Sequence, residues 1–207
     1  MLVDRAGFRG FIAGAVALGA LLAAAPATHG IETCSRVYHK PPLGDAPGLG
    51  KPPLLIGDSV VGFAMKPLQK LGYRINAQGC RTFPRGITAL KRESHKRGLP
   101  SLIVVELGTA GNVTRQNIAR LVQLLGPKRK LVLVTPRKFG GASFSGGVDP
   151  DAADYHRAAE RYPGRVFVTP WAEFGEQHPE WFYPDMVHPN PEGQKAFVDF
   201  LEAALYV

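Results

Sequence analysis

Short apolar runs alternate with helix-length segments along most of this chain, and this alternation limits the possible folds more than any other feature. The apolar runs are rich in β-branched residues and bounded by Gly or Pro, at residues 53–57, 73–77, 101–107, 130–135 and 165–169. Helical patterns follow them at residues 59–71, 87–97, 114–125, 151–161 and 191–205. Runs of this kind are typical of strands buried on both faces of a parallel sheet. The sequence therefore predicts an α/β fold, a three-layer α/β/α sandwich with a parallel five-stranded sheet.

Composition is that of a globular protein with one folded domain. Of the 207 residues, 45% are hydrophobic, which is enough to bury a core. The two cysteines exclude a disulfide scaffold or a Cys-rich zinc fold, but they allow a single bridge. The formal net charge is +8, yet the basic residues are scattered and accompany no nucleic-acid-binding motif. We therefore expect no nucleic-acid partner.

The N-terminal residues have the pattern of an export signal. Arg5 and Arg9 precede an apolar run over residues 11–25. Ala25, Pro26 and Ala27 then form the small-x-small pattern of a cleavage site. About 15 apolar residues are fewer than the ~20 that span a bilayer. We therefore predict a signal peptide at residues 1–27 and a secreted or extracytoplasmic protein of the cell envelope. An uncleaved anchor, which would associate the protein with a membrane, and a buried N-terminal helix are the alternatives.

Residues 28–52 are rich in Pro and Gly, show no period and are interpreted as a lead-in to a domain at residues 53–207. Export would place Cys34 and Cys80 in an oxidising compartment, where a cysteine pair is usually bonded. We therefore predict a Cys34–Cys80 disulfide. Two free thiols are the alternative.

Chemistry is expected where the strands end, because sites in doubly wound folds lie at the carboxyl edge of the sheet. The first apolar run is followed by Gly57, Asp58 and Ser59. A Ser at a strand-to-helix turn lies at a helix N-terminus, where unpaired amides and the helix dipole favour the oxyanion that nucleophilic attack creates. Asp and Ser are also common N-caps, so a capping role is the alternative.

A second polar cluster precedes the last helical segment. Asp185 and His188 lie three positions apart, so the carboxylate can hydrogen-bond the imidazole and fix its tautomer. The alternative is a capping Asp and a surface His. The other histidines lie at no metal-ligand spacing, so no metal site is expected. Because a parallel sheet brings both ends of the chain to one edge, Ser59, His188 and Asp185 can meet as a Ser-His-Asp set.

Four blocks in a fixed order give the chain a resemblance to a known family. The motif Gly-Asp-Ser-Val at residues 57–60 and the pair Asp185 and His188 resemble the outer blocks of the SGNH (GDSL-like) hydrolases. Gly79 is similar to the Gly of their second block, and residues 106–112 are similar to the third. The resemblance implies a flavodoxin-like SGNH hydrolase fold for nearly the whole chain after the lead-in.

The same resemblance implies acyl transfer through a serine acyl-enzyme, without a cofactor. Ser59 would attack an ester carbonyl, with His188 as general base and Asp185 orienting it. The Gly-Asp-Ser-Val and Gly-Thr-x-Gly blocks together are similar to the extracytoplasmic domains of cell-wall polysaccharide O-acyltransferases. They imply a monomeric esterase or O-acyltransferase whose substrate is a small acyl ester or a glycan. Hydrolysis and transfer use the same residues, so both stay open.

The third block departs from the family pattern. The family's oxyanion hole combines two backbone amides, here of Ser59 and Gly79, with the side chain of an Asn. Ala110 occupies that Asn position, and the nearest Asn is Asn112. We place Asn112 in the predicted oxyanion hole. If that donor is absent, kcat falls by about 10²–10³, and a catalytically weak or inactive carbohydrate-binding or accessory protein becomes the second interpretation.

Other segments have two interpretations each. The Gly- and Ser-rich residues 136–149 form either a lid over the site or a long surface loop. The aromatic residues at positions 171 and 181–183 are expected in the core or at its rim more than against a sugar. Arg81 meets either an acidic substrate or a surface ion-pair partner. Glu106, at the end of a buried strand, has a capping or hydrogen-bonding role by default.

Overall fold

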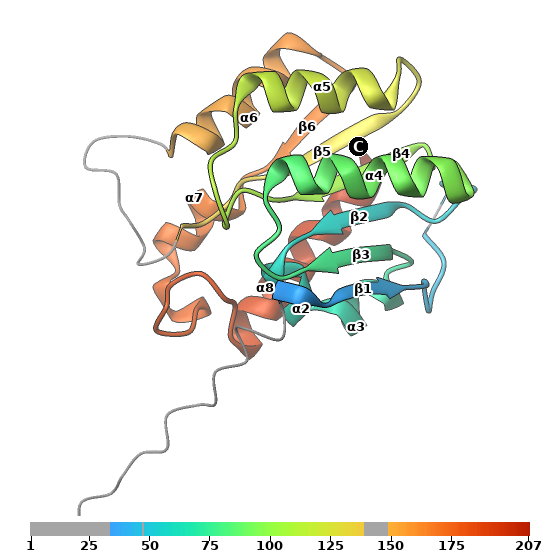
Figure 1. Cartoon of the computed structure of the whole chain (residues 1–207). Coiled ribbons are helices and arrows are strands. Elements are labelled where there is room, and N and C mark those ends of the chain that lie inside the picture. Colours follow the sequence, from blue (N-terminus) through green and yellow to red (C-terminus); the bar gives the residue numbers. More distant parts are fainter. Residues whose placement is uncertain (1–33, 47, 139–148) are drawn as a thin grey trace, which may run out of the picture.

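The structure, a computed structural model, describes residues 34–46, 48–138 and 149–207. Its centre is one sheet with the strand order β1-β3-β2-β4-β5-β6 (Figure 1). The strands are Val37–Lys40 (β1), Leu54–Gly57 (β2), Arg74–Gln78 (β3), Leu102–Glu106 (β4), Lys130–Val134 (β5) and Val166–Thr169 (β6). β1 is antiparallel to β3, and every other neighbouring pair is parallel. The carboxyl ends of β2 to β6 therefore meet at one edge of the sheet.

Helices pack on both faces of this sheet and complete three layers (Figure 1). One face carries α4 (Phe83–Arg97), α5 (Arg115–Leu125) and α6 (Pro150–Arg161). The other carries α2 (Ser59–Phe63), α3 (Met65–Lys70), α7 (Trp171–Gln177) and α8 (Pro191–Ala203), with the short 3-10 turns η2 (Pro179–Trp181) and η3 (Ala204–Tyr206). None of the described helices has the length and apolar character needed to cross a membrane.

The strands bury both of their faces, as their apolar sequence predicts. Along β2, Leu54 and Ile56 face the core cluster under α4, α5 and α6, whereas Leu55 faces the cluster under α2, α3 and α8. All three side chains are buried. The α/β/α fold class and the five parallel strands expected from the apolar runs are confirmed.

The sheet has one strand more than the five predicted, so it is a mixed sheet of six strands. β1 comes from the Pro/Gly-rich lead-in and pairs with β3, with Val37 opposite Gln78 and Lys40 opposite Ile75. At four residues it is too short to show a period, and its side chains are mostly exposed. A strand at the edge of a sheet needs no apolar run, because only part of its surface is covered. The sequence therefore contains no sign of this strand within the lead-in.

The helical pattern at residues 59–71 forms two short helices instead of one. Pro67 explains the break, because a proline ring clashes with the carbonyl four residues earlier and has no N–H to donate. That carbonyl belongs to Phe63, where α2 ends, and α3 begins at Met65.

The remaining helices differ from their predicted bounds by a few residues. α4 begins at Phe83, four residues before the predicted start, because Pro84 fits the first turn of a helix. The side chain of Thr114 caps α5 by accepting a hydrogen bond from the amide of Asn117 at 3.2 Å. The predicted signal peptide lies outside the described residues, as do residues 139–148 of the predicted lid or loop.

Candidate active site

Ser59 is presented by a tight turn between β2 and α2. Asp58 caps α2: its Oδ1 accepts a hydrogen bond from the amide of Val60 at 3.0 Å. Gly57 is required at the end of β2, because a Cβ there would lie 2.2 Å from Cγ2 of Val61. The turn therefore holds Ser59 as the first residue of the helix, next to amides that have no partner within the helix.

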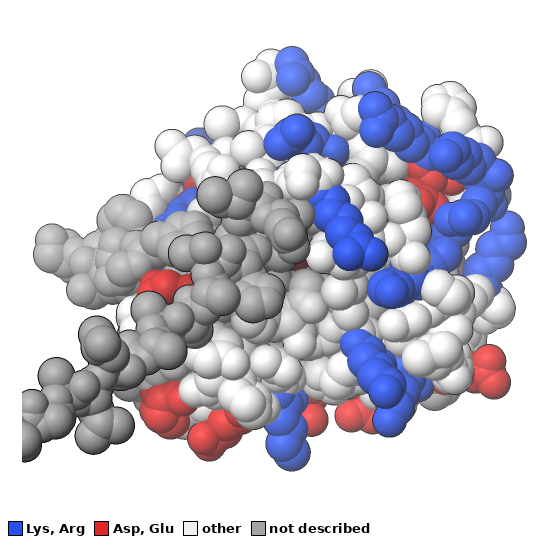
Figure 2. Space-filling model, turned by 60° about the horizontal axis from the view of Figure 1, so that its bottom comes forward, with Lys and Arg blue, Asp and Glu red and all other residues white. Residues whose placement is uncertain are grey.

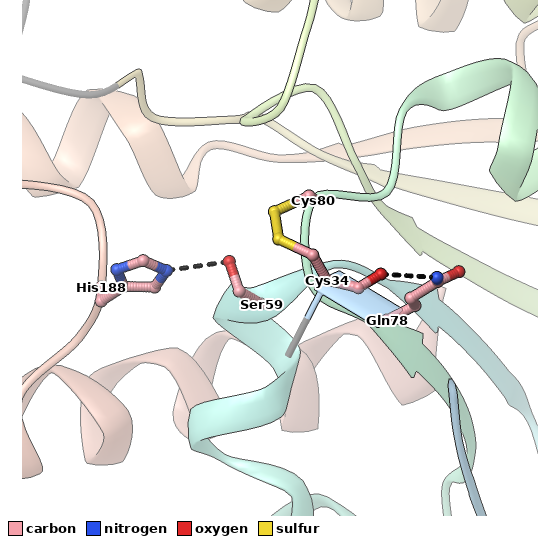
Figure 3. The surroundings of a disulfide bond; sticks show 5 residues. All are labelled: Cys34, Ser59, Gln78, Cys80 and His188. Carbon is pink, nitrogen blue, oxygen red and sulfur yellow. Dashed lines mark hydrogen bonds between the residues drawn. A yellow bond between two sulfur atoms is a disulfide. The ribbon is translucent and has the colours of Figure 1, made fainter. Parts of the chain in front are cut away.

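His188 and Asp185 complete a continuous chain of hydrogen bonds to Ser59. Nε2 of His188 lies 2.8 Å from Oγ of Ser59 (Figure 3). Nδ1 of the same ring lies 2.6 Å from Oδ2 of Asp185. Oδ1 of Asp185 accepts the amides of Val187 and His188, both at 2.9 Å. The structure thus brings together the three residues that the sequence placed at opposite ends of the chain.

The charge of Asp185 fixes the proton on the imidazole. Burial raises the pKa of Asp185, but its hydrogen bonds with His188 and Val187 outweigh burial and hold that pKa below its ordinary value. An ionised Asp185 can only accept a hydrogen bond, so Nδ1 of a neutral His188 carries the proton. The lone pair of Nε2 then faces the hydroxyl of Ser59, which is the arrangement of a general base and its nucleophile.

The turn that carries this pair is packed and bonded on several sides. The amide of Tyr183 donates to the carbonyl oxygen of His188 at 2.9 Å. The ring of Phe63 stacks on His188 with a centroid distance of 4.9 Å. From the far side, Nε of Arg137 donates to the carbonyl oxygen of Met186 at 2.9 Å. Sequence reasoning missed Phe63 and Arg137, because neither belongs to a block of the motif.

The predicted oxyanion donors lie in loops at the same edge of the sheet. Gly79 is buried directly after β3, and its neighbour Cys80 lies beside Ser59 (Figure 3). Asn112 is exposed in the loop between β4 and α5, where Ala110 is half-buried. Within the described residues the side chain of Asn112 has no hydrogen-bond partner. The donation of these groups to an oxyanion stays a prediction.

Lys138 ties the third loop to its surroundings. Its Nζ donates to the carbonyl oxygens of Gly108 and Gly111, the latter at 3.1 Å, and pairs with Asp151 at 2.5 Å. Gly108 has a φ of 126° and Gly111 a φ of 147°, so both adopt backbone conformations that favour glycine. The loop that contains Ala110 is therefore held by two glycine turns and by the half-buried ammonium group of Lys138.

A pair of buried carboxyl groups lies under the turn that carries Ser59, and sequence reasoning did not identify it. The amide of Asp58 donates to Oε2 of Glu106 at 3.3 Å, and both side chains are buried. Burial raises the pKa of Asp58; burial and the charge of Asp58 raise that of Glu106 well above its ordinary value. Taken as two carboxylates, each has an oxygen without a donor within the described residues. The raised pKa of Glu106 favours a proton on that carboxyl group, and a protonated carboxyl group can donate where a carboxylate cannot.

Arg81 has a structural position that neither sequence interpretation anticipated. Its side chain is buried, and its Nη1 donates to the carbonyl oxygens of Gly57 at 3.2 Å and Asn76 at 2.6 Å. Burial and the neighbouring charge of Arg85 lower its pKa to about 10, against the opposing effect of Asp58. Arg81 therefore joins the ends of β2 and β3 beneath the site and is neither a surface ion pair nor an exposed substrate contact.

The Cys34–Cys80 disulfide is present, with the two Cα atoms 5.0 Å apart. It ties the segment before β1 to the loop after β3, on the side of Ser59 away from His188 (Figure 3). Nε2 of Gln78 donates to the carbonyl oxygen of Cys34 at 2.8 Å and adds a second link. The disulfide therefore anchors the loop that contains Gly79 to the segment before β1.

The aromatic residues near the Asp185 turn are mainly core residues, as preferred from the sequence. Trp171 is fully buried and contacts the rings of Trp181, Phe182 and Phe197. Tyr183 is 40% exposed and lies 5.9 Å from the ring of Phe63. Among the described residues no cluster of His, Cys, Asp and Glu is suited to hold a metal ion.

Comparisons with known proteins agree with this arrangement, although no protein-family model matches the chain. The C-terminal catalytic domain of peptidoglycan O-acetyltransferase A (OatA) from Streptococcus pneumoniae is 27% identical, with a TM-score of 0.66 over 77% of this chain and 94% of that domain. A GDSL-like lipase from Bacteroides thetaiotaomicron, 18% identical, has a TM-score of 0.58 over 79% of this chain and 92% of the lipase. The chain has the SGNH hydrolase fold. The resemblance inferred from the four sequence blocks is confirmed.

The relatives of this SGNH-fold chain include longer proteins. The O-acetyltransferase OatA of Staphylococcus aureus strain NCTC 8325 is 30% identical over 158 residues, which cover 72% of this chain and 24% of that protein. The chain therefore spans about a quarter of the length of the curated relatives that it matches. The part matched in S. pneumoniae OatA is its C-terminal catalytic domain.

Proposed function

We propose that this chain is a serine esterase or O-acyltransferase that acts on small acyl esters, with Ser59, His188 and Asp185 as its catalytic triad. The observation that carries the proposal is the chain of hydrogen bonds from Asp185 through His188 to Ser59, 2.6 and 2.8 Å long. These contacts lie at the carboxyl edge of the sheet, where α/β folds bind their ligands. The likeness to the catalytic domain of OatA supports the same class of reaction.

In the first half of the proposed reaction, Nε2 of His188 accepts the proton of the Ser59 hydroxyl while Oγ attacks the ester carbonyl. The carbonyl π electrons move to oxygen and form a tetrahedral oxyanion. His188 then donates the proton to the leaving alcohol as the carbon–oxygen bond breaks, and the acyl group stays on Ser59. Asp185, ionised throughout, stabilises the imidazolium that exists between these steps.

The second half regenerates the free serine. Water or a sugar hydroxyl gives its proton to His188 and attacks the acyl-Ser59 carbonyl, and Ser59 leaves with the proton returned to it. Water yields a carboxylic acid, whereas a sugar hydroxyl yields an O-acylated glycan. Exposed Phe63 and Tyr183 beside His188 supply an apolar surface for a short acyl group.

The oxyanion is assigned to the amides of Ser59 and Gly79 and to the side chain of Asn112. The two amides are backbone groups, one at the start of α2 and one directly after β3, so they do not depend on the residue at position 110. Asn112 is two residues from the position of the family Asn and is exposed, so its side chain is accessible to a ligand. Three donors would give a full oxyanion hole, and two would give a slower enzyme.

The cell-envelope glycan is the proposed substrate, outside the cytoplasm. The likeness to the catalytic domain of a peptidoglycan O-acetyltransferase supports this substrate class. The disulfide beside the site supports an oxidising compartment, in line with the export signal expected at residues 1–27. An inactive carbohydrate-binding protein with the same fold is the second candidate, favoured by Ala110 alone.

The test is hydrolysis of a short-chain aryl ester by the full chain. We expect slow turnover that Ser59→Ala lowers by about 10⁴-fold or more, because the nucleophile cannot be replaced by binding alone. Ser101→Ala, at an exposed position before β4, serves as the matched control and should keep the parent rate. Equal activity of the Ser59→Ala and parent proteins would contradict the catalytic triad. No activity in either protein would favour an inactive carbohydrate-binding protein.

A further inference from the structure

A basic groove lies beside the proposed active site, between α4 and the strands β1 and β3. Its volume is about 530 Å³, and its lining is mostly charged and polar, with Val37 and Ala89 as the apolar members and no Phe, Tyr or Trp. The cations on its walls are Arg81, Arg85, Arg92, Lys96 and Arg97. Figure 2 turns the β1 side of the molecule forward and shows Lys and Arg side chains gathered toward the right, the side on which α4 ends in Figure 1.

Three of these cations form a stripe along one face of α4. Arg85, Arg92 and Lys96 are separated by seven and four residues, a spacing that aligns side chains on one face of a helix. From Arg85 to Lys96 the stripe covers about 16 Å along the helix axis. All three side chains are exposed, and within the described residues none has an ion pair or a hydrogen bond. Their charges are therefore available to a ligand.

The stripe is not explained by the stability of the helix. Arg85 lies in the first turn of α4, where the helix dipole disfavours a cation, and that turn holds no acidic residue. Arg92 and Lys96 repel one another at i and i+4. Within the stripe only Lys96, in the last turn, suits the dipole. Helix stability therefore does not account for Arg85 or for the repulsion between Arg92 and Lys96.

The carboxylate in the groove does not neutralise the stripe. Glu93 is buried and pairs with Arg74 and Arg97, each at 3.4 Å. Its Oε1 also accepts a hydrogen bond from Asn76 at 3.0 Å. The single acid of the groove wall is thus already occupied by other cations, and the net charge of the lining stays positive.

One end of the groove reaches the neighbourhood of the nucleophile. Gln78 and Arg81 line it, and they flank Gly79 and the disulfide-bonded Cys80. Figure 3 shows Cys80 beside Ser59, on the side away from His188. Because α4 runs antiparallel to β3, the stripe leads from this end along the helix and away from the site.

We propose that this groove binds an extended polysaccharide whose sugars carry anionic groups, carboxylate or phosphate, and so holds a charged glycan alongside the catalytic serine. Arginine side chains bind both groups in a bidentate manner, and a row of cations suits charges repeated along a polymer. The binding does not depend on the acyl chemistry, so it extends the proposed function and can be tested separately from it.

A glycan fits the groove better than a nucleic acid does. Proteins that bind single strands use aromatic side chains on which the bases stack, and the lining contains no Phe, Tyr or Trp. Its neutral polar side chains at exposed Thr88 and half-buried Gln78 suit the hydroxyl groups of sugars instead. Nucleic acid is therefore the outcome that the experiment must exclude.

The experiment measures binding of the full chain to labelled oligogalacturonate, whose sugars carry carboxylates, and to a labelled phosphomannan oligosaccharide, whose sugars carry phosphates, at 50 and 200 mM salt. We expect binding to one or both that weakens at the higher salt concentration, because exposed charges are screened. The variant Arg85→Gln, Arg92→Gln, Lys96→Gln should weaken binding about tenfold, since each exposed ion pair contributes a small factor. It should hydrolyse an aryl ester at the parent rate. The polymer that binds more tightly identifies the charged group.

The control variant Lys91→Gln, Arg120→Gln, Lys128→Gln removes the same charge from positions outside the groove lining. It should change affinity by less than about twofold. Three results would contradict glycan binding in the groove: an equal loss of affinity in both triple variants, an unchanged affinity in the Arg85, Arg92 and Lys96 variant, or no binding of the parent protein to either anionic polymer. Tighter binding of a single-stranded DNA of equal charge would replace the glycan by a nucleic acid.

Discussion

Asp58 and Glu106 are two carboxyl groups buried against the turn that presents Ser59, and their chemistry differs from that of the half-buried Asp185. Asp185 keeps its charge because backbone amides bind it. Glu106 instead keeps its proton, because burial and the charge of Asp58 raise its pKa well above its ordinary value. The site therefore contains two kinds of acid. Glu106 stays neutral beneath the turn of Ser59, whereas Asp185 stays ionised and orients His188.

We expect Glu106→Gln to stabilise the protein increasingly as the pH is raised above about 4.5. Folded Glu106 holds its proton to a higher pH than unfolded Glu106, so folding binds a proton above the ordinary pKa and the free energy of unfolding falls as pH rises. A glutamine keeps both hydrogen bonds and binds no proton. The measurement is the Tm of both proteins from pH 5 to pH 8.

The background for that comparison is Glu160→Gln, at an exposed position of α6. The difference in Tm between Glu106→Gln and the parent should grow with pH, while that of Glu160→Gln should not. A constant difference for Glu106→Gln across the range would mean that Glu106 is ionised in the folded protein.

The third oxyanion donor is tested by substitution in the loop between β4 and α5. Asn112→Ala should lower kcat for an aryl ester by about 10²–10³ with little change in KM, because an oxyanion exists only near the transition state. Ala110→Asn should then add little. If instead Asn112→Ala leaves kcat unchanged and Ala110→Asn raises it, the oxyanion hole has only two donors, and Ala110 accounts for the low kcat of the parent protein.

Individual site residues were predictable only where they belong to a short motif. Ser59, Asp185 and His188 were found because they follow strands and match a family pattern. Asp58 was seen as a cap, which it is, but the carboxyl pair it forms with Glu106 depends on strand register, Gly57 opposite Glu106. The stacking of Phe63 on His188 joins residues far apart in the sequence, and no pattern of single residues reveals it.

Among the secondary-structure elements, β1 is the one held by covalent chemistry. It is an edge strand of four residues, and the Cys34–Cys80 disulfide fastens its start to the loop after β3. Cys80 has a φ of 54°, in the left-handed region that non-glycine residues rarely adopt. The bridge and the pairing of β1 with β3 together fix that conformation next to Ser59.

Reduction of the disulfide should destabilise the protein and loosen this edge. The bridge spans 46 positions, for which chain entropy gives a ceiling of about 4 kcal/mol. We expect a reductant to lower the Tm by up to roughly 10 °C and to speed amide exchange in β1 before β4. The double variant Cys34→Ser, Cys80→Ser should show the low Tm and no response to reductant. A parent Tm that reductant does not change would contradict this account.

The topology of the whole molecule explains why residues 129 positions apart form one site. β2 and β4 are adjacent central strands, and the chain returns through β5 and β6 before the turn that carries His188. The sequence predicted this arrangement because buried parallel strands have continuous apolar runs. It did not predict β1, because an exposed edge strand carries no such run, nor the basic groove, because the cations on α4 read from the sequence as scattered charge.

The central claim is that Ser59 is a nucleophile activated by His188, and its most direct test is covalent labelling of the full chain with a fluorophosphonate, measured by intact mass and peptide mapping. The account predicts one adduct per chain, on Ser59, that is absent in Ser59→Ala and present in the Ser101→Ala control. A parent protein that stays unlabelled, or a label that persists in Ser59→Ala, would contradict it.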